Sequence, residues 1–471
     1  MSKRRVLDAV DARADDLRAT ARAVWETPEL GLREEASAAR LRDLLAGEGF
    51  DVTGGVGGMP TAFVAEYGSG EPRVGLLGEY DALPGLSQST SAERDPIEPD
   101  APGHGCGHNL FGAAAAGAAL AVAAAVDAGD VDGTVRFYGC PAEETLVGKV
   151  YMARAGVFDD LDAALTWHPS DFTRVKRGSA LAMDSVRFAF EGEAAHAAAA
   201  PEAGRSALDA VQLLDTGVEY LREHVPDEVR VHYALTEGGA APNVVPAAAE
   251  GWYYVRAPDR AQVERVTDRL RDVAAGAARM TRTRVRERFV TGCYDILSNQ
   301  TLGDVLQRNL DAAGAIPYDE ADRALAADLR ATLDDGRVES ALASLPPADR
   351  ERAAGRPLCP APVAPTDVER VASSSGDNGD VSYIAPMAQF YAATWPVGTP
   401  AHSWQAVAAS GDLGLAAVPY VARVLAGATY DLMADAGLVR AVRAEFESAT
   451  ADRPYESPLP PDAEPPFDPV A

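Results

Sequence analysis

Short apolar runs separated by helical stretches dominate most of this chain. The runs at 74–77, 134–138, 163–167 and 390–394 are too short for typical helices and predict buried strands. Between the first two runs, the alanine-rich segment 112–128 predicts a helix. Strands that alternate with helices favour a mostly parallel sheet with helices on its faces. The pattern therefore predicts an α/β fold.

The middle of the chain follows another order. Its patterns predict strand, helix, strand, strand, helix and strand at 180–190, 205–222, 229–235, 250–255, 260–280 and 283–289. That order is the split ferredoxin-like unit. We expect residues 178–290 to form an inserted α+β domain, and residues 1–177 and 291–471 to form the larger domain around it. Within the larger domain, residues 318–367 predict a helical excursion with a proline-rich return.

Polar side chains follow the predicted strands of the larger domain. Asp81, Glu143 with Glu144, and His168 each come shortly after a strand, and His402 lies in the loop after the last one. In open α/β sheets, ligands bind outside the carboxyl ends of the strands. These residues can therefore meet at one edge of the sheet although they are distant in sequence.

The loop 103–109 reads GHGCGHN and contains Cys106 and His108. Thiolate, imidazole and carboxylate ligands together suit a zinc-like ion. A Cys-x-His pair alone is weak, because a buried cysteine is more often a small packing residue, and His104 is either a ligand or an ordinary loop residue. Glu143 and Glu144 are adjacent and face different directions if extended, so one can bind a metal while the other transfers protons. The set predicts a metallohydrolase.

Composition adds limits on size and partners. A chain of 471 residues is too long for one ordinary core, so two or more domains are expected. Asp and Glu number 71 against 43 Lys and Arg, which gives a net charge of −28. Such a surface repels nucleic acid and anionic membranes, and we expect neither as a partner. It favours a halophilic source over an acidic binding surface, because a salt-rich cytoplasm screens the self-repulsion.

Targeting signals are not visible. The basic residues 1–5 are followed by no apolar core, so no signal peptide is predicted. The apolar stretch 112–126 is too short to span a bilayer. The four cysteines are widely spaced and show no disulfide framework. We expect a cytoplasmic protein whose cysteines stay reduced.

A set of motifs runs along most of the chain: WETPELGLREE at 25–35, GEYDALPGLSQ at 78–88, GHGCGHNL at 103–110, CPAEE at 140–144, TWHP at 166–169, EGEAAHAAAAPEAGRSALDAV at 191–211, GGAAPNVVP at 238–246, GDNGDVS at 376–382 and GTPAHSW at 398–404. Together these motifs resemble one family, the dinuclear-metal amidohydrolases and peptidases that include carboxypeptidase G, the aminoacylases and the plant auxin-conjugate hydrolases. Within that family the chain resembles the branch of the p-aminobenzoyl-glutamate hydrolase B subunit.

The resemblance implies roles for the larger domain. Two divalent ions, zinc or manganese, would bind there and Cys106 would bridge them. His108 and His168 would help to hold one ion, and Glu144 and His402 the other. Glu143 would serve as general base and then as acid, and Asp81 would orient a ligand.

The resemblance also implies roles for residues 178–290, which would be the family's lid and dimerisation domain. His196 would stabilise the oxyanion, in its own active site or in that of its partner in a homodimer. Asn243 and Arg256 would contact a small-molecule amide substrate. From the residues alone, an ordinary surface role is favoured for His196. Arg256 could equally be a surface charge or part of a structural ion pair.

We expect a metal-dependent hydrolase of N-acyl or N-aroyl amino acids or dipeptide-like substrates, with the aminobenzoyl-glutamate type as the leading example. A dipeptidase or carboxypeptidase of the same family is the alternative. Two hypotheses belong to other classes. Gly103, Gly105 and Gly107 precede a helix and could cradle the phosphate of a nucleotide-binding regulator, although the lysine of a P-loop is missing. A non-catalytic metal-dependent scaffold is the other.

Overall fold

The computed structural model describes residues 2–467 and divides into two compact units. Unit 1 holds the chain up to Gly178 together with Leu297–Arg370 and Val381–Tyr455, and unit 2 holds Ser179–Ile296, Val371–Asp380 and the chain from Glu456. From the sequence we expected all of 291–471 in the larger domain. Residues 371–380 group with unit 2 because Val371–Ala372 pairs with Ser179–Ala180 in a short parallel ladder.

Unit 1 is built on a seven-stranded sheet in the order β1-β2-β4-β3-β5-β13-β6. Its strands are β1 (Asp51–Gly54), β2 (Phe63–Ser69), β3 (Arg73–Glu79), β4 (Gly133–Cys140), β5 (Ala163–Ser170), β6 (Arg174–Lys176) and β13 (Met387–Ala393). The central strands β4, β3, β5 and β13 are parallel, and the outer pairings are antiparallel. Residues 74–79 of β3 are buried at every position, as expected for a strand covered on both faces.

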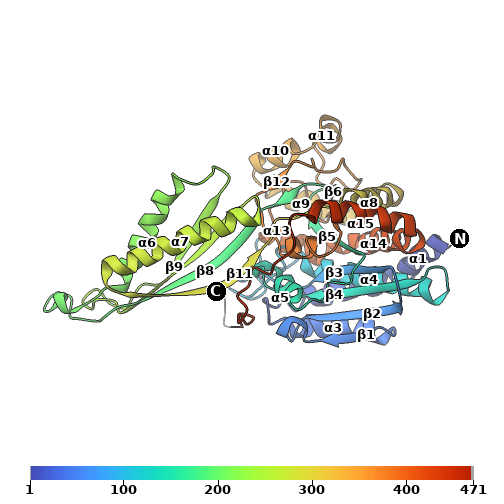
Figure 1. The fold of residues 1–471 in the computed structure, drawn as a ribbon. Coiled ribbons are helices and arrows are strands. Elements are labelled where there is room, and N and C mark those ends of the chain that lie inside the picture. Colours follow the sequence, from blue (N-terminus) through green and yellow to red (C-terminus); the bar gives the residue numbers. More distant parts are fainter. Residues whose placement is uncertain (1, 468–471) are drawn as a thin grey trace. The chain divides into compact units, whose positions relative to one another are not determined.

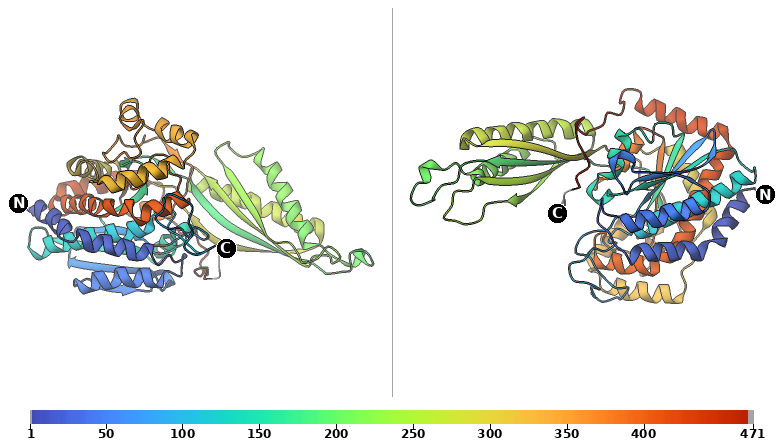
Figure 2. Two further views of the ribbon diagram at one scale, coloured as in Figure 1. Left: turned by 180° about the vertical axis from the view of Figure 1, so that it is seen from behind. Right: turned by 90° about the horizontal axis from the view of Figure 1, so that it is seen from below.

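Helices flank this sheet (Figures 1 and 2). Those of unit 1 are α1 (Ser2–Ala12), α2 (Ala14–Trp25), α3 (Glu35–Gly47), α4 (His108–Asp127), α5 (Gly148–Arg154), α8 (Gln300–Ala313), α9 (Glu320–Ala331), α10 (Asp335–Ala343), α11 (Pro347–Ala353), α13 (Trp404–Gly411), α14 (Ala417–Ala434) and α15 (Ala436–Thr450). A short helix, α12 (Asn378–Ser382), crosses the boundary between the units. Helices α4 and α14 pack against each other and against β3.

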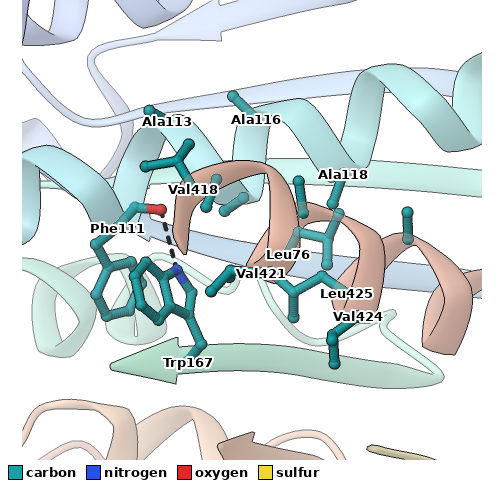
Figure 3. Close-up of a cluster of buried hydrophobic side chains, with 14 of the residues drawn as sticks. Leu76, Phe111, Ala113, Ala116, Ala118, Trp167, Val418, Val421, Val424 and Leu425 are labelled. Carbon is teal, nitrogen blue, oxygen red and sulfur yellow. Dashed lines mark hydrogen bonds between the residues drawn. The ribbon is translucent and has the colours of Figure 1, made fainter. Parts of the chain in front are cut away.

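The core between α4, α14 and the sheet fixes the frame of unit 1. Leu76 of β3 and Val421 of α14 lie against the small side chains of α4 (Figure 3). The indole Nε1 of Trp167 donates a hydrogen bond of 3.2 Å to the carbonyl oxygen of Phe111, and the two rings pack 5.5 Å apart. Strand β5 is thus joined to the first turn of α4.

Helix α4 corrects one expectation. It begins at His108 and extends over 20 residues, so it is long enough to cross a membrane, and Leu413–Ala434 passes the same test of length and composition. The length of these helices therefore does not exclude a membrane-spanning segment. In both helices 89% of the apolar window is buried inside the protein, which is the position of a core helix.

The excursion predicted at 318–367 contains α9, α10 and α11 and has a small core of its own. Phe172 from the turn after β5 and Val397 from the loop after β13 join Val338 of α10 in this cluster. The excursion is therefore anchored to the carboxyl ends of two central strands.

Unit 2 contains the predicted strand and helix order. Its elements are β7 (Ser179–Ala180), β8 (Ala182–Glu191), α6 (Ala207–Arg222), β9 (Arg230–Glu237), β10 (Ala248–Ala257), α7 (Arg260–Thr281), β11 (Arg284–Cys293) and β12 (Val371–Ala372). Strands β8 to β11 form an antiparallel sheet in the order β11-β8-β10-β9. In chain order these are the fourth, first, third and second strands of the unit, which is the ferredoxin-like arrangement. A separate apolar core lies between this sheet and its two helices.

Candidate metal centre

The predicted metal ligands meet at the carboxyl edge of the unit 1 sheet. Cys106 and His108 come from the loop and first turn of α4, Glu144 follows β4, His168 lies near the end of β5, and His402 lies in the loop after β13. Among the described residues, three groups of potential ligand atoms lie within 4.8 Å of one another: Cys106–His108–His168, Cys106–Glu144–His402 and Glu79–His108–Glu143. Cys106 belongs to the first two groups, so its sulfur lies between them.

Cys106 and His168 form the centre of the cluster. The Cys106 Sγ lies 3.3 Å from His168 Nε2. Burial lowers the pKa of His168 to about 3, so this imidazole is neutral, which is the form that binds metals. Burial raises the pKa of the Cys106 thiol, and Glu144 adds to the effect. A thiolate at this position therefore needs a cation beside it.

His108 is held by Asp81. The Nδ1 atom of His108 lies 2.7 Å from Asp81 Oδ1, while Asp81 Oδ2 accepts a hydrogen bond of 2.9 Å from the backbone N–H of Glu144. Burial alone would lower the pKa of His108, but Asp81 and then Cys106 raise it above its usual value. With Asp81 on Nδ1, the Nε2 atom points toward the cluster, where it is buried without a hydrogen-bond partner among the described residues.

Glu144 and His402 form the second side of the cluster. Their Oε2 and Nε2 atoms lie 3.2 Å apart, and Glu144 Oε1 is buried without a hydrogen-bond partner in the part of the chain described. Glu143 turns the other way, and its Oε2 lies 3.9 Å from His108 Nε2. Both glutamates begin a 3₁₀ turn, Glu143–Thr145, so adjacent residues reach different ligand groups.

The donor set fits divalent ions. A tetrahedral ion with bonds of about 2.0 to 2.3 Å holds its ligand atoms roughly 3.3 to 3.6 Å apart. The distances Cys106 Sγ to His168 Nε2 and Glu144 Oε2 to His402 Nε2 are 3.3 and 3.2 Å. His108 Nε2 and Glu144 Oε1 are buried without a hydrogen-bond partner in the described structure, which leaves both atoms available to an ion. Sulfur, imidazole nitrogen and carboxylate oxygen are also the ligand types that zinc and its neighbours accept.

A buried ion pair that no sequence pattern indicated lies beside this cluster. Lys149 Nζ on α5 lies 2.7 Å from Glu79 Oε1 at the end of β3, and both side chains are almost completely buried. The other oxygen of Glu79 lies 3.3 Å from His108 Nε2. Glu79 ends an apolar run, and Lys149 lies 70 residues further on, so no local spacing marks the pair. The pair places a carboxylate, already balanced by an ammonium group, next to a predicted ligand.

The loops around the cluster have unusual backbone conformations. Ala142, Leu146 and His402 lie at φ of 53°, 57° and 60°, in the left-handed region that residues with a Cβ seldom adopt. The N–H of His402 donates a hydrogen bond of 2.9 Å to the carbonyl of Gly105, where an added Cβ would lie 3.3 Å from His402 Cα. Glycine at 105 therefore allows the two ligand loops to approach each other.

Two further buried groups surround the cluster without joining any ligand group. His104 Nε2 lies 3.1 Å from the carbonyl of Val24, and burial lowers its pKa to about 4. Glu34 accepts hydrogen bonds from the N–H of Ala142 and the hydroxyl of Thr61, and burial raises its pKa to about 8. His104, left open as a ligand or loop residue, bonds to the backbone in this structure.

The predicted substrate residues lie in unit 2. His196 pairs with Val244 in an isolated bridge, and Asn243 accepts a hydrogen bond of 2.9 Å from the N–H of Ala197, so His196 and Asn243 lie on adjoining segments. His196 Nδ1 accepts hydrogen bonds from the two following N–H groups, of Ala198 and Ala199. A neutral imidazole with these contacts carries its proton on Nε2, as an oxyanion donor requires.

Arg256 lies apart from that pair of segments, on β10. Its guanidinium lies over the Tyr254 ring, 5.7 Å from the centroid. The Nε atom is buried without a hydrogen-bond partner in residues 2–467.

Known families and proteins include several that are similar to this chain. A family model described as Peptidase family M20/M25/M40 matches residues 75–460. Over 466 residues the chain is 41% identical to the B subunit of p-aminobenzoyl-glutamate hydrolase from Escherichia coli K12, covering 96% of each protein. It is 34% identical to the Xaa-Arg dipeptidase of Mus musculus over 320 residues, which cover 65% of this chain and 70% of that protein.

Among solved structures, the fold is similar to that of the Bacillus subtilis YXEP protein, a dinuclear metal binding peptidase of the M20 family. The two chains superpose with a TM-score of 0.55 at 18% identity, over 90% of this chain and 99% of the other. At that identity the likeness establishes the shared fold.

Proposed function

Because this chain belongs to Peptidase family M20/M25/M40, we propose that it is a metal-dependent hydrolase of amide bonds in N-acyl or N-aroyl amino acids. One observation carries the proposal. Cys106 lies between two groups of ligand atoms, one with His108 and His168 and the other with Glu144 and His402. A shared ligand atom flanked by two ligand groups is an arrangement that could hold a pair of ions.

The five residues of these two groups would hold two divalent ions. Bound there, such ions lower the pKa of a coordinated water and polarise a carbonyl group. Asp81 fixes the orientation of His108 through Nδ1 and holds the Glu144 backbone, so one carboxylate aligns both sides of the centre.

Glu143 is the residue we assign to proton transfer. It sits at the rim of the cluster with 14% of its side chain exposed, so it can reach both a ligand and incoming water. As a carboxylate it takes the proton of the attacking water, and as the acid it returns that proton to the leaving amine nitrogen. His196, protonated on Nε2, would donate to the oxyanion, and Asn243 and Arg256 would bind the substrate.

The substitution Glu143→Gln tests this assignment. We expect bound zinc or manganese per chain to stay at the wild-type level, while kcat for p-aminobenzoyl-glutamate falls by roughly 100-fold or more, as for other general acid–base residues. Metal content and hydrolysis are measured on the same preparation, in high potassium chloride.

Glu98→Gln provides the matched control, since Glu98 is exposed in a loop and belongs to no ligand group. Hydrolysis by Glu143→Gln at the wild-type rate would remove Glu143 from the mechanism. Retained metal with no hydrolysis of any amide by the wild-type protein would favour a metal-dependent scaffold.

The leading substrate is p-aminobenzoyl-glutamate, which the name of the E. coli relative specifies for that protein. Dipeptides are the second candidate because of the similarity to an Xaa-Arg dipeptidase. A screen of N-acyl amino acids, p-aminobenzoyl-glutamate and dipeptides, with and without a chelator, ranks the two classes by kcat/KM.

The proposal extends to the oligomeric state, the bound metal and the cellular location of the protein. Unit 2 would act as a lid and as the contact of a homodimer. The alternative is pairing with a homologous second chain. The E. coli hydrolase has an A subunit and a B subunit, and both are similar to this chain. Zinc or manganese would occupy the metal centre. The protein would work in the cytoplasm of a salt-adapted organism. Light scattering with purified chain alone distinguishes a homodimer from a chain that needs a different partner.

A further inference from the structure

A cavity of about 570 Å³ lies in unit 1, beyond the carboxyl ends of β5 and β13. Its walls come from the turn after β5, from helix α10 of the excursion and from the loop 398–400. Small-molecule sites commonly measure roughly 300 to 1,000 Å³. The cavity is a wide depression that is largely open to solvent, and its volume lies within that range. The small core that anchors the excursion holds α10 in place beside it.

Three arginines from separate segments line this cavity: Arg174, Arg337 and Arg370. Within the described residues, no carboxylate oxygen lies within the 4.0 Å of an ion pair from any of their side-chain nitrogens. That is unusual in a chain with 71 acidic and 43 basic residues, where many arginines are paired. Three guanidinium groups without an ion-pair partner, one of which (Arg174) has the carboxylate of Asp171 acting on its pKa, favour an anionic ligand.

Arg174 has an unmet donor. Its Nε atom is buried and has no hydrogen-bond partner in residues 2–467, and its guanidinium lies 5.7 Å from the centroid of the Phe172 ring. Burial lowers the pKa of Arg174, Asp171 raises it in part, and the nearby Arg370 lowers it again. An anion in the cavity would satisfy the donor and relieve the repulsion between the two cations.

The acidic residues of the wall are already engaged. Asp171 accepts hydrogen bonds from the N–H of Gly398, at 3.1 Å, and from the hydroxyl of Ser170, at 3.2 Å. Asp334 caps α10 and accepts from the N–H of Gly336 at 2.9 Å. These contacts hold both carboxylates in structural roles, so the arginines remain the groups that a ligand would meet.

The cavity adjoins the candidate metal centre through two short stretches of chain. Asp171 follows His168 by three residues and Pro400 precedes His402 by two, which is about 10 Å of extended chain or less. Two parts of the cavity wall therefore lie within about 10 Å, measured along the chain, of the ligand residues His168 and His402.

We propose that the cavity is a carboxylate subsite that selects substrates whose amino acid carries a second, acidic group, such as an N-acyl-glutamate. The proposal rests on the proposed function, because it places the scissile amide at the neighbouring centre. It also separates the two candidate substrate classes, since three arginines would repel the side chain of an Xaa-Arg dipeptide.

The test combines Arg337→Gln with Arg370→Gln, because both side chains are exposed and neither forms a described ion pair. We expect KM for p-aminobenzoyl-glutamate to rise about 10-fold or more, the effect of losing hydrogen bonds to a charged group. For p-aminobenzoyl-glutamine we expect a change below about twofold. Arg308→Gln, exposed on α8 outside the cavity, is the control and should match the wild type. Equal changes for both substrates would overturn the proposal.

Calorimetric binding of N-acetylglutamate to the Glu143→Gln protein separates the two hypotheses. If the wild type cleaves no amide, yet binding weakens 10-fold when both arginines are replaced, the cavity proposal stands and the proposed function fails. If hydrolysis is present but the arginine variants bind N-acetylglutamate as tightly as before, the subsite is wrong. Glutarate that binds through the arginines without competing with substrate would make the cavity a regulatory site and would also overturn the proposal.

Discussion

The buried pair of Lys149 and Glu79 makes a prediction about stability that depends on bound metal. Their charged atoms lie 2.7 Å apart with almost no exposed surface, so Lys149→Met leaves a buried carboxylate without its ammonium partner. Breaking such a pair costs about 3 to 5 kcal/mol. Because the other oxygen of Glu79 lies 3.3 Å from His108 Nε2, a cation bound at His108 would offset part of this cost. We therefore expect the full loss in chelator and a loss smaller by at least about 1.4 kcal/mol, or one decade in the unfolding equilibrium, in excess zinc.

Urea unfolding followed by tryptophan fluorescence measures this loss, since four of the five tryptophans (Trp25, Trp167, Trp395 and Trp404) belong to unit 1. Lys3→Met is the control. Its ion pair with Asp431 is partly exposed, so its loss should cost at most about 1 kcal/mol. The double variant with Glu79→Gln should recover much of the stability. An equal loss with and without zinc would refute the coupling of Glu79 to the metal centre, and a loss below about 1 kcal/mol in chelator would refute the buried pair itself.

Further predictions concern titration, metal content and catalysis. Burial raises the pKa of Glu34 to about 8 from 4.5, so the folded protein holds a proton that the unfolded chain releases in this window, and stability should fall as pH rises from about 4.5 to 8. For Glu34→Gln, the urea midpoint of unfolding should not show this fall with rising pH. A fall as steep as that of the wild type would contradict the assignment to Glu34. Cys106→Ser should lower bound zinc per chain by at least one ion in elemental analysis, whereas Cys140→Ser, a buried cysteine in no ligand group, should not. His196→Ala should reduce kcat roughly 100- to 1000-fold at unchanged zinc content; a rate within threefold of the wild type would exclude His196 from the reaction.

The central strands of unit 1 could be predicted because they are short, apolar and buried on both faces. The runs at 74–77, 134–138 and 163–167 lie inside β3, β4 and β5. The same reasoning placed polar residues at their carboxyl ends, where the structure gathers His168, Glu144 and their neighbours. Strand order, by contrast, depends on long-range pairing, and no local pattern marks that β13 lies beside β5.

The unpredicted parts of the site depend on side chains that only tertiary packing brings together. Lys149 follows a glycine in a short helix and resembles a surface residue until the fold buries it against Glu79. The helix expected to start at 112 begins at His108, because Gly107 at φ 76° turns the chain directly into the helix. The cavity combines arginines nearly 200 positions apart, Arg174 and Arg370, with no spacing that could reveal it.

Helix α4 has a consequence for how such chains diverge. Its residues are nearly all buried, and Gly117 lies so close to α2 that an added Cβ would come within 2.4 Å of Leu17. A substitution that adds methylenes to a packed core typically costs about 1 to 3 kcal/mol. Natural selection should therefore restrict this helix by side-chain volume on all its faces, while exposed walls such as α10 vary with the molecules that each enzyme meets. Related proteins would then retain the small side chains of α4 together with the position of His108 at its first turn.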